Sequence, residues 1–432
     1  MRRLSPLMRT PLFTLLAISI AFCIRAFASL GRPIARFPDS LGYDTFQLVG
    51  SIDRFWPIPF LYSLVQSDSA RVALHVIVGS IAWAWCALLL SRISKYPRIV
   101  LSAVLLLGLS PQVVRYDLAI LSESLGISFM VLAVAASINL QRRRSTSSVV
   151  IWLLTVSLCA HTRPAQLLIL FVVLATPAYN FVRSKGRQLS ATTFAMLIVL
   201  LAGFLQLTQN SNTSALNFYT VLQERVLTND VRFKWFSDHG MPVTQGMREA
   251  LGYDYAANFP KDVSDIIALP IGQQPPALMR VGGPELARWI RDDGWTTYAK
   301  YVATHPKDSQ SRLTSLTNAT LSPLNDDFLP LDNGPMIPRV LFGAWELWSV
   351  LGLFATTMLL LRNRREFTMV TGFIISTFSV FAVSMLTSGI EHPRHAVTTA
   401  VAVRLIALVA VVLSLPRAKP KAELDESVDE LS

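Results

Sequence analysis

The chain has 432 residues, of which 52% are hydrophobic and 16% are charged, and its formal net charge is +11. Soluble globular domains carry about a quarter charged residues, so this composition excludes an ordinary soluble protein. The arginines and lysines gather in short clusters between apolar runs and form no basic surface interleaved with aromatic residues, which argues against nucleic-acid binding.

Repeated apolar runs of roughly 18 to 22 residues match the hydrocarbon thickness of a bilayer. They predict an all-α polytopic membrane protein with about ten transmembrane helices. The expected spans are residues 11–30, 71–91, 98–116, 119–140, 149–161, 164–182, 190–208, 338–361, 367–387 and 396–415.

If these helices alternate in direction, all the basic clusters between them fall on one side of the membrane. The clusters are Arg2, Arg3 and Arg9; Arg92, Lys95 and Arg98; Arg142, Arg143 and Arg144; Arg183, Lys185 and Arg187; Arg362, Arg364 and Arg365; and Arg417, Lys419 and Lys421. Basic loops stay in the cytoplasm, so both termini are expected there. We expect an integral protein of a bacterial plasma membrane.

The chain divides into an N-terminal transmembrane module (1–208), an external segment (209–337), C-terminal transmembrane helices (338–416) and a disordered cytoplasmic tail (417–432). In the first external loop, 31–70, apolar residues at helical spacing predict a helix lying in the membrane interface. These residues are Phe46, Val49, Ile52, Phe55 and Trp56. The external segment is too long for a structureless loop, so a small ordered cap is expected.

The first external loop reads PDSLGYD at 38–44 and has Asp39 close to the outer end of the first span. Aspartate is favoured at helix N-caps, so capping is one interpretation. The other is a carboxylate at the membrane surface that acts as a general base or a metal ligand, because partial burial tunes its proton affinity. Asp44 is a nearby competitor that we expect on the solvated face of the interfacial helix.

Glu123 lies at the start of the fourth span, within RYDLAILSESLG at 115–126. Negative charge near a helix N-terminus gains about 0.3–1 kcal/mol, which offers a structural explanation. A carboxylate at an apolar boundary costs more than this unless it is paired or hydrated, which favours a functional site. Arg115 and Asp117 are expected to pair with each other at the surface.

The sequence HTRP at 161–164 interrupts the apolar run between spans 149–161 and 164–182. It predicts a turn at the outer surface, and one bent helix is the alternative. Arg163 could snorkel to lipid headgroups. Its place opposite the basic clusters favours phosphate binding, because the planar guanidinium suits phosphate oxygens.

The last external turn, GIEHPRHAV at 389–397, has the densest group of ionisable residues among the spans. His392 and His395 are three residues apart and could bind a metal, although the sequence offers no clear third ligand. We favour an anion site in which Arg394 meets the anion and Glu391 orients the arginine. A solvated turn without a function is the remaining alternative.

Four motifs together resemble the C-type (GT-C) membrane glycosyltransferases, which use polyprenyl-phosphate-linked sugars. They are PDSLGY after the first span, SESL at the start of a middle helix, the TRP turn, and ExxRH before the last span. The order of several spans, an external segment and a few terminal spans is also similar. The WWDYG sequence of oligosaccharyltransferases is absent, which argues against transfer of whole glycans to asparagine.

The resemblance implies that Asp39 is the general base near the acceptor, that Glu123 is a second catalytic acid, and that the donor phosphate is held by Arg163 and Arg394. The supporting residues would be Ser40, Tyr43, His161, Glu391 and His395. The implied reaction moves a sugar from a polyprenyl-phosphate donor to a hydroxyl of a glycan, lipid or protein acceptor at the outer membrane face, with inversion. No cofactor is required, but a divalent cation such as Mg²⁺ or Mn²⁺ at Asp39 is compatible with the sequence.

A multi-helix transporter or lipid flippase is the alternative, because buried charges can mark a transport path. Transporter sites usually lie near the midplane, in broken helices of repeated halves. The sequence shows neither a repeat nor charges near the middle of the expected spans. A scaffold whose external segment binds a partner would leave the gathering of charged residues unexplained.

Overall fold

The computed structural model describes residues 6–49, 54–183, 191–209, 211–244, 247, 278, 282–322, 342–389 and 391–415. The chain is mainly helical across these residues, and an isolated parallel bridge joins Ala35 and Ala119. The all-α prediction is confirmed for the described part of the chain.

The N-terminal half contributes α1 Pro6–Ser29, η1 Pro38–Tyr43, α2 Pro57–Ser63, α3 Asp68–Ile93, α4 Pro97–Gly108, α5 Pro111–Val114, η2 Arg115–Leu118, α6 Glu123–Arg142, α7 Thr146–Ala160, η3 Pro164–Leu167, α8 Leu168–Arg183 and α9 Ala191–Gln209. The rest contributes α10 Ser211–Val221, η4 Leu222–Val226, α11 Asp230–Asp238, α14 Gly283–Trp289, η8 Ile290–Gly294, α15 Trp295–Thr304, α16 Pro306–Leu321, α17 Trp345–Arg362, α18 Arg364–Thr387 and α19 His392–Ser414.

Among the described residues, six helices are long and apolar enough to cross a bilayer, namely α1, α3, α6, α9, α18 and α19. The expected span 98–116 is broken instead, because α4 ends at Gly108 and the chain bends by 48° before it continues through α5 and η2. If this bent pair counts as one span, the number rises to seven. The expectation of about ten spans is therefore not confirmed.

The chain breaks at residues 161–163, where the sequence predicted a turn. α7 ends at Ala160, and η3 begins at Pro164 and leads into α8. α7 and α8 contact each other. Residues 149–182 are therefore two helices rather than one bent helix, and both are shorter than the six long apolar helices.

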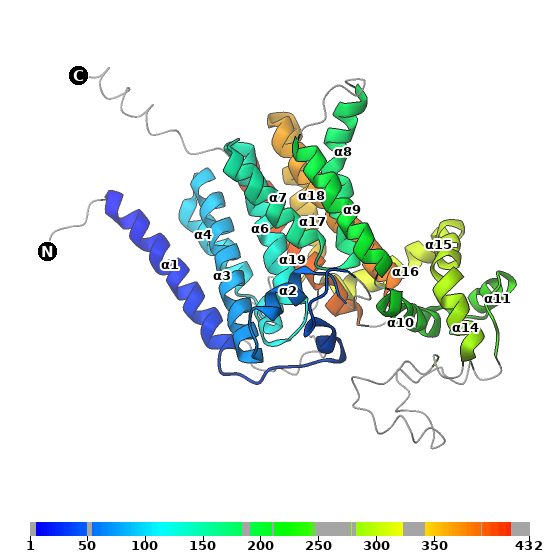
Figure 1. The fold of residues 1–432 in the computed structure, drawn as a ribbon. Coiled ribbons are helices and arrows are strands. Elements are labelled where there is room, and N and C mark those ends of the chain that lie inside the picture. The colour runs from blue at the N-terminus through cyan, green and yellow to red at the C-terminus, as the bar shows by residue number, and fades with distance from the viewer. Residues whose placement is uncertain are drawn as a thin grey trace, which may run out of the picture.

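α6 and α19 lie at the centre of the bundle and are buried over most of their length, whereas α1 lies at the edge (Figure 1). α19 packs on α17, α18 and α6, and α3 packs on both α4 and α6. One apolar core joins these helices. The outer faces of α1, α9 and α17 expose many leucine and phenylalanine side chains, as is typical of a surface that faces lipid.

The first external loop differs from the prediction of an interfacial helix. Phe46 has no regular secondary structure, Val49 lies in a bend, and Ile52 lies outside the described residues. The loop has η1 and α2 instead, and α2 starts at Pro57 because the fixed φ of proline suits the first helical position. Phe46 packs against a phenylalanine ring of α2, and Phe55 is buried. The apolar residues therefore fold the loop onto the bundle instead of lining one helix face.

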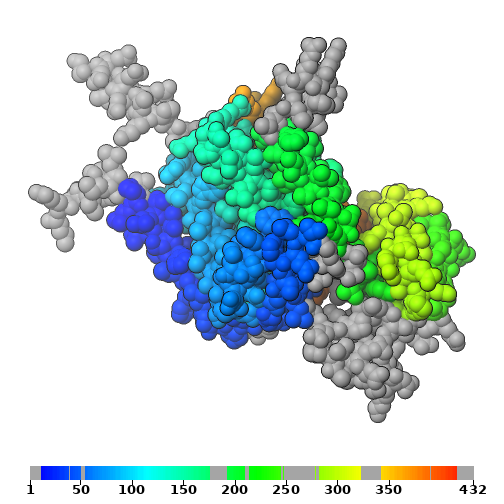
Figure 2. Space-filling view, viewed as in Figure 1, coloured from blue at the N-terminus to red at the C-terminus, as the bar shows by residue number. Residues whose placement is uncertain are grey.

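The helices α10, α11, α14, α15 and α16 form a second unit beside the bundle, which appears as a separate lobe in Figure 2. This unit has its own apolar core, in which Phe218 packs against Trp289, Trp295 and Tyr298. α16 packs against α18 and α19 and so joins the lobe to the bundle. The described part of the expected external segment is thus mainly helical, and residues 210, 245–246, 248–277, 279–281 and 323–341 lie outside the described residues.

The bundle has two different ends (Figure 1). The first loop and the starts of α6 and α19 lie at one end, which we call the loop end. The turns that join α3 to α4, α6 to α7 and α17 to α18 lie at the other, which we call the basic end. Its exposed cations are Arg92, Lys95, Arg98, Arg142, Arg143, Arg144, Arg362, Arg364 and Arg365.

Candidate functional site

Arg394 is the centre of a charge cluster at the loop end. It lies in the first turn of α19, which begins at His392, so part of the expected turn 389–397 is helical. Its Nε donates to Oε1 of Glu123 (2.5 Å), Nη1 to Oε2 of Glu391 (2.6 Å) and Nη2 to Oδ2 of Asp39 (2.6 Å). One guanidinium, only 3% exposed, therefore joins the carboxylates of two distant segments, η1 and α6, to a carboxylate of its own segment.

Asp39 reaches this cluster because the first loop is fixed to the segment before α6. The amide of Ala35 donates to the carbonyl of Leu118 (2.9 Å), and the amide of Ile120 donates to the carbonyl of Ala35 (3.0 Å). The hydroxyl of Ser40 then donates to the carbonyl of Ile120 (2.7 Å). Ser40 thus anchors the loop, and Asp39 is directed to arginines rather than to a helix cap.

Glu123 is the first residue of α6 and is buried. Its Oε1 accepts hydrogen bonds from both Arg394 and Nη2 of Arg163. Arg163 comes from the break after α7, where it has the extended backbone that a following proline favours. Its Nε donates to Oγ of Ser122 (2.9 Å). The interrupted apolar run therefore brings this arginine to the start of α6.

Arg54 belongs to the same cluster and was missed by the sequence interpretation. Its Nη2 donates to Oδ1 of Asp39 (2.6 Å), and its guanidinium carbon lies 5.2 Å from the ring centre of Tyr43. Like Arg163, Arg54 stands apart from the basic clusters in the sequence, which was a signal that could have found it. We call the six charged side chains the open cluster: Asp39, Arg54, Glu123, Arg163, Glu391 and Arg394.

Four side chains of the open cluster reach solvent. The exposed fractions are 34% for Asp39, 23% for Glu391, 21% for Arg54 and 17% for Arg163. Burial raises the pKa of Asp39, but the charges of Arg54 and Arg394 outweigh burial and hold this pKa below its usual value. For Glu391, burial outweighs the attraction of Arg394, so its pKa is raised. The two carboxylates therefore differ in their affinity for a proton.

The two histidines expected to support the site lie differently. Nδ1 of His395 is 3.5 Å from Nη1 of Arg163, at the edge of the open cluster. His161 is not brought into contact with the cluster. Its Nδ1 donates to the carbonyl of Ser157 (2.9 Å), and its ring packs near Phe55.

The residues present do not fit a divalent cation. Both carboxylate oxygens of Asp39 accept from arginines, which leaves this group unsuited to bind a metal. Nε2 of His392 lies 2.7 Å from Nη2 of Arg312. Within the described residues, no three His, Cys, Asp or Glu side chains gather in a way that could hold a metal ion.

A second ionic group adjoins the first and is buried, and we call it the closed cluster: Arg25, Tyr62, His75, Asp117 and Ser124. The carboxylate of Asp117 accepts from Nε (2.7 Å) and Nη2 (2.8 Å) of Arg25 and from Oγ of Ser124 (2.6 Å). Nδ1 of His75 lies 2.8 Å from the carbonyl of Asp117, and the hydroxyl of Tyr62 lies 2.7 Å from Nε2 of His75. The predicted surface pair of Arg115 and Asp117 is wrong, because Asp117 is buried and pairs with an arginine of the first span.

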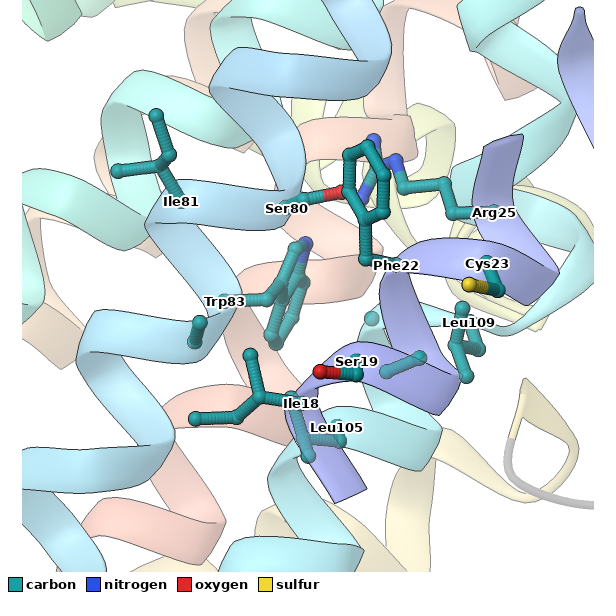
Figure 3. A pocket seen from close by; sticks show the side chains of 13 residues that line it. Ile18, Ser19, Phe22, Cys23, Arg25, Ser80, Ile81, Trp83, Leu105 and Leu109 are labelled. Carbon is teal, nitrogen blue, oxygen red and sulfur yellow. The ribbon is translucent and has the colours of Figure 1, made fainter. Parts of the chain in front are cut away.

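An apolar cavity of about 430 Å³ lies between α1, α3 and the end of α4, with Arg25 at its border (Figure 3). Its walls include Phe22 of α1, Trp83 of α3 and Leu109. A Cβ on Gly108 would lie 2.5 Å from the ring of Trp83, so a glycine is needed where the indole meets the end of α4. The end of α4, where the predicted span is broken, therefore forms part of the cavity wall.

Arg404 corrects the expectation that no charge lies near the middle of a span. It lies inside α19 and is fully buried. Nη1 donates to the carbonyl of Ala400 (2.7 Å) and Nη2 to that of Phe342 (2.6 Å), and the guanidinium lies 4.5 Å from the ring centre of Phe342. Backbone carbonyls and an aromatic face stabilise this cation.

No family model matches this chain, and no curated protein matches it. The fold and the site define a class: a helical protein with several apolar helices that could span a membrane, and with a partly exposed carboxylate–arginine cluster at one end of its bundle.

Proposed function

We propose that the protein is a membrane glycosyltransferase of the GT-C type, which moves a sugar from a polyprenyl-phosphate donor to a hydroxyl of a glycan, lipid or protein acceptor. The observation that carries the proposal is the open cluster, in which Arg394 joins Asp39, Glu123 and Glu391 at one end of the bundle. The motifs that resemble the family contribute five of its six residues.

The exposed cations of the basic end support an orientation. Because loops rich in arginine and lysine stay in the cytoplasm, the basic end would be cytoplasmic and the loop end external. The open cluster would then lie at the outer face of a bacterial plasma membrane, with both termini inside. About ten crossings would result if the bent α4–α5 pair, α7, α8 and α17 also cross the bilayer.

Arg163 and Arg54 are the arginines best placed to touch the donor phosphate. Both are partly exposed, whereas Arg394 is buried and directs its N–H groups to three carboxylates. Arg394 would then hold the carboxylates in position, and its positive charge would still act on the phosphate over a short distance. The planar donor fork of arginine suits phosphate oxygens.

The reaction is a single displacement at the anomeric carbon. The acceptor oxygen forms a bond to this carbon while the bond from the carbon to the phosphate oxygen breaks, and its electron pair leaves with the polyprenyl phosphate. The acceptor proton passes to a carboxylate of the cluster, for which Asp39 is the candidate from the family resemblance. Negative charge grows on the departing phosphate, where Arg163 and Arg54 stabilise it.

The cavity beside α1 supports a lipid-linked substrate. It is lined by apolar side chains of helices that could lie in the bilayer, and Arg25 at its border pairs with Asp117. Asp117 also accepts from Ser124, the residue after Glu123. Part of the donor hydrocarbon could occupy this cavity while its phosphate lies at the open cluster.

Transport remains a second candidate because the chain is bent between α4 and α5 and because Arg404 is buried inside α19. Broken helices and intramembrane charges are typical of transporters. The open cluster lies at the end of the bundle rather than at its middle, which favours an enzyme. A flippase would move the intact lipid-linked sugar and would release no polyprenyl phosphate.

The test uses the purified full chain in lipid vesicles, with polyprenyl-phosphate hexoses and pentoses labelled in the sugar. Extracted bacterial membranes supply acceptors. The expected result is a labelled acceptor together with free polyprenyl phosphate, in equal amounts. If the intact donors cross the vesicle membrane without cleavage, the protein is a transporter and the proposal fails.

A further inference from the structure

The three carboxylates of the open cluster differ in how many of their oxygens are occupied. Oδ1 of Asp39 accepts from Arg54 and Oδ2 from Arg394. Glu123 is buried, with Oε1 shared between two arginines. Glu391 uses Oε2 for Arg394, and its side chain is 23% exposed. Oε1 of Glu391 is therefore the carboxylate oxygen best placed to meet an acceptor hydroxyl.

The backbone at Glu391 is unusual for a residue with a side chain. Its φ of 55° and ψ of 35° lie in the left-handed region, which is strained for a residue that has a Cβ. Such outliers cluster at functional sites. Glu391 occupies the N-cap position of α19, yet its side chain caps no amide and is directed to Arg394. The strained backbone thus serves the open cluster rather than the helix start.

The neighbouring segment holds Glu391 in this place. A Cβ on Gly389 would lie 2.4 Å from the backbone carbonyl of Thr220 in α10, so this segment approaches the second helical unit closely. On the other side, the ion pair with Arg394 fixes one carboxylate oxygen. The carboxylate is thereby positioned and still open to solvent.

The surrounding charges give Glu391 and Asp39 different affinities for a proton. The groups that face Glu391 are Arg394 of α19, Asp39 of η1 and Glu123 of α6. Burial and the two negative charges raise the pKa of Glu391, while Arg54 and Arg394 keep the pKa of Asp39 low. A general base works best when its pKa is close to the working pH, so Glu391 suits the role better.

We propose that Glu391, rather than Asp39, takes the proton of the acceptor hydroxyl, and that Asp39 is a positioning residue for Arg54 and Arg394. This assignment rests on the proposed transferase function. As the acceptor oxygen bonds to the anomeric carbon, its proton moves to Oε1 of Glu391, and the electron pair of the broken bond leaves on the polyprenyl phosphate. Glu391 then releases the proton to water.

The experiment compares Glu391→Gln with Asp39→Asn in the full chain reconstituted in vesicles. Each is assayed for transfer from the polyprenyl-phosphate sugar that the wild type cleaves, between pH 5 and 9, and for binding of farnesyl phosphate. Glu346→Gln is the matched control, because Glu346 is an exposed glutamate in the first turn of α17 outside the cluster.

Glu391→Gln should lower kcat by about 100-fold or more, in the range expected for a general base, with farnesyl phosphate bound as in the wild type. The acidic limb of the pH–kcat profile should disappear in this variant. Asp39→Asn should instead weaken farnesyl phosphate binding and keep that acidic limb. Glu346→Gln should behave as the wild type.

Transfer by Glu391→Gln at the wild-type rate, together with loss of transfer in Arg163→Ala, would overturn the assignment and leave the proposed function intact. If the wild type transfers no sugar from any polyprenyl-phosphate donor, both the proposed function and the assignment of Glu391 are contradicted. If Asp39→Asn, and not Glu391→Gln, loses the acidic limb, Asp39 is the base.

Discussion

The closed and open clusters use the same chemistry at the same end of the bundle, but they differ in exposure. In the closed cluster, Arg25 and Asp117 are 2% and 0% exposed, and the pair is bidentate. In the open cluster, four of the six side chains reach solvent. A buried pair that is complete in itself maintains one geometry, whereas a pair at an accessible edge can exchange a partner for a ligand.

The two clusters are also connected. Ser124 donates to Asp117 in the closed cluster and follows Glu123 of the open cluster in α6. The closed cluster therefore fixes the start of α6, and with it the carboxylate that two arginines share. The closed cluster therefore contains residues that build the site, and the open cluster contains residues that we propose act in it. Variants of the two clusters should differ accordingly.

The largest effect on stability is expected from the closed cluster. Asp117→Leu would leave Arg25 buried without its carboxylate, which typically costs about 3–5 kcal/mol of unfolding free energy. Denaturant unfolding in mixed micelles measures this change. The double variant Arg25→Leu with Asp117→Leu should recover much of the loss. A single variant as stable as the wild type would show that the pair is not buried as described.

Arg163→Ala should lower sugar transfer by about 100- to 1,000-fold, because one donor to the developing phosphate charge is lost. Its unfolding free energy should change much less than that of Asp117→Leu, since Glu123 keeps its bond to Arg394. Transfer assays in vesicles measure the loss of activity, and denaturant unfolding in micelles measures the change in stability. Arg365→Ala, an exposed arginine of the basic end, is the control and should leave both unchanged.

Arg54→Ala should weaken farnesyl phosphate binding by about 1.5–3 kcal/mol, the usual contribution of a hydrogen bond to a charged group. It also removes one of the charges that lower the pKa of Asp39, so this pKa should move toward its usual value. Isothermal titration in detergent measures the binding. Unchanged affinity would mean that Arg54 only orients Asp39.

The smallest effects concern the pH dependence of stability, where Asp39 and Glu391 should act in opposite directions. The pKa of Asp39 is lowered in the folded state, so its contribution is complete above its usual value of about 3.8 and is lost as the pH falls below it. The pKa of Glu391 is raised, so stability declines as the pH rises from about 4.5 through the raised pKa.

Glu391→Gln should therefore abolish the decline above pH 4.5, and Asp39→Asn should abolish the loss at lower pH. Unfolding of each variant between pH 3 and 8 provides the measurement. The same pH profile in both variants and the wild type would contradict the assigned environments.

The sequence predicted the helical class, and five of the charged residues that it singled out contact one another in the structure. Asp39, Glu123, Arg163, Glu391 and Arg394 were selected because charges among apolar segments are costly unless they are paired, and the structure joins them in one cluster. This reasoning uses only the positions of charged residues among the apolar segments, and these positions can be read from a single sequence.

Other features depend on contacts between distant segments and could not be predicted in the same way. The bridge between Ala35 and Ala119 fixes the loop, and Arg25 pairs with Asp117 across 92 positions in the chain. The break after α4 had a local signal in Gly108 and Pro111, since proline interrupts a helix, but the long apolar run around them favoured a continuous span.

The most direct test measures farnesyl phosphate binding by the full chain in nanodiscs, in the wild type, Arg163→Ala and Arg365→Ala. We expect saturable binding that weakens about tenfold or more in Arg163→Ala and stays unchanged in Arg365→Ala. Equal affinity in all three proteins would contradict the claim that the open cluster is a phosphate-binding site.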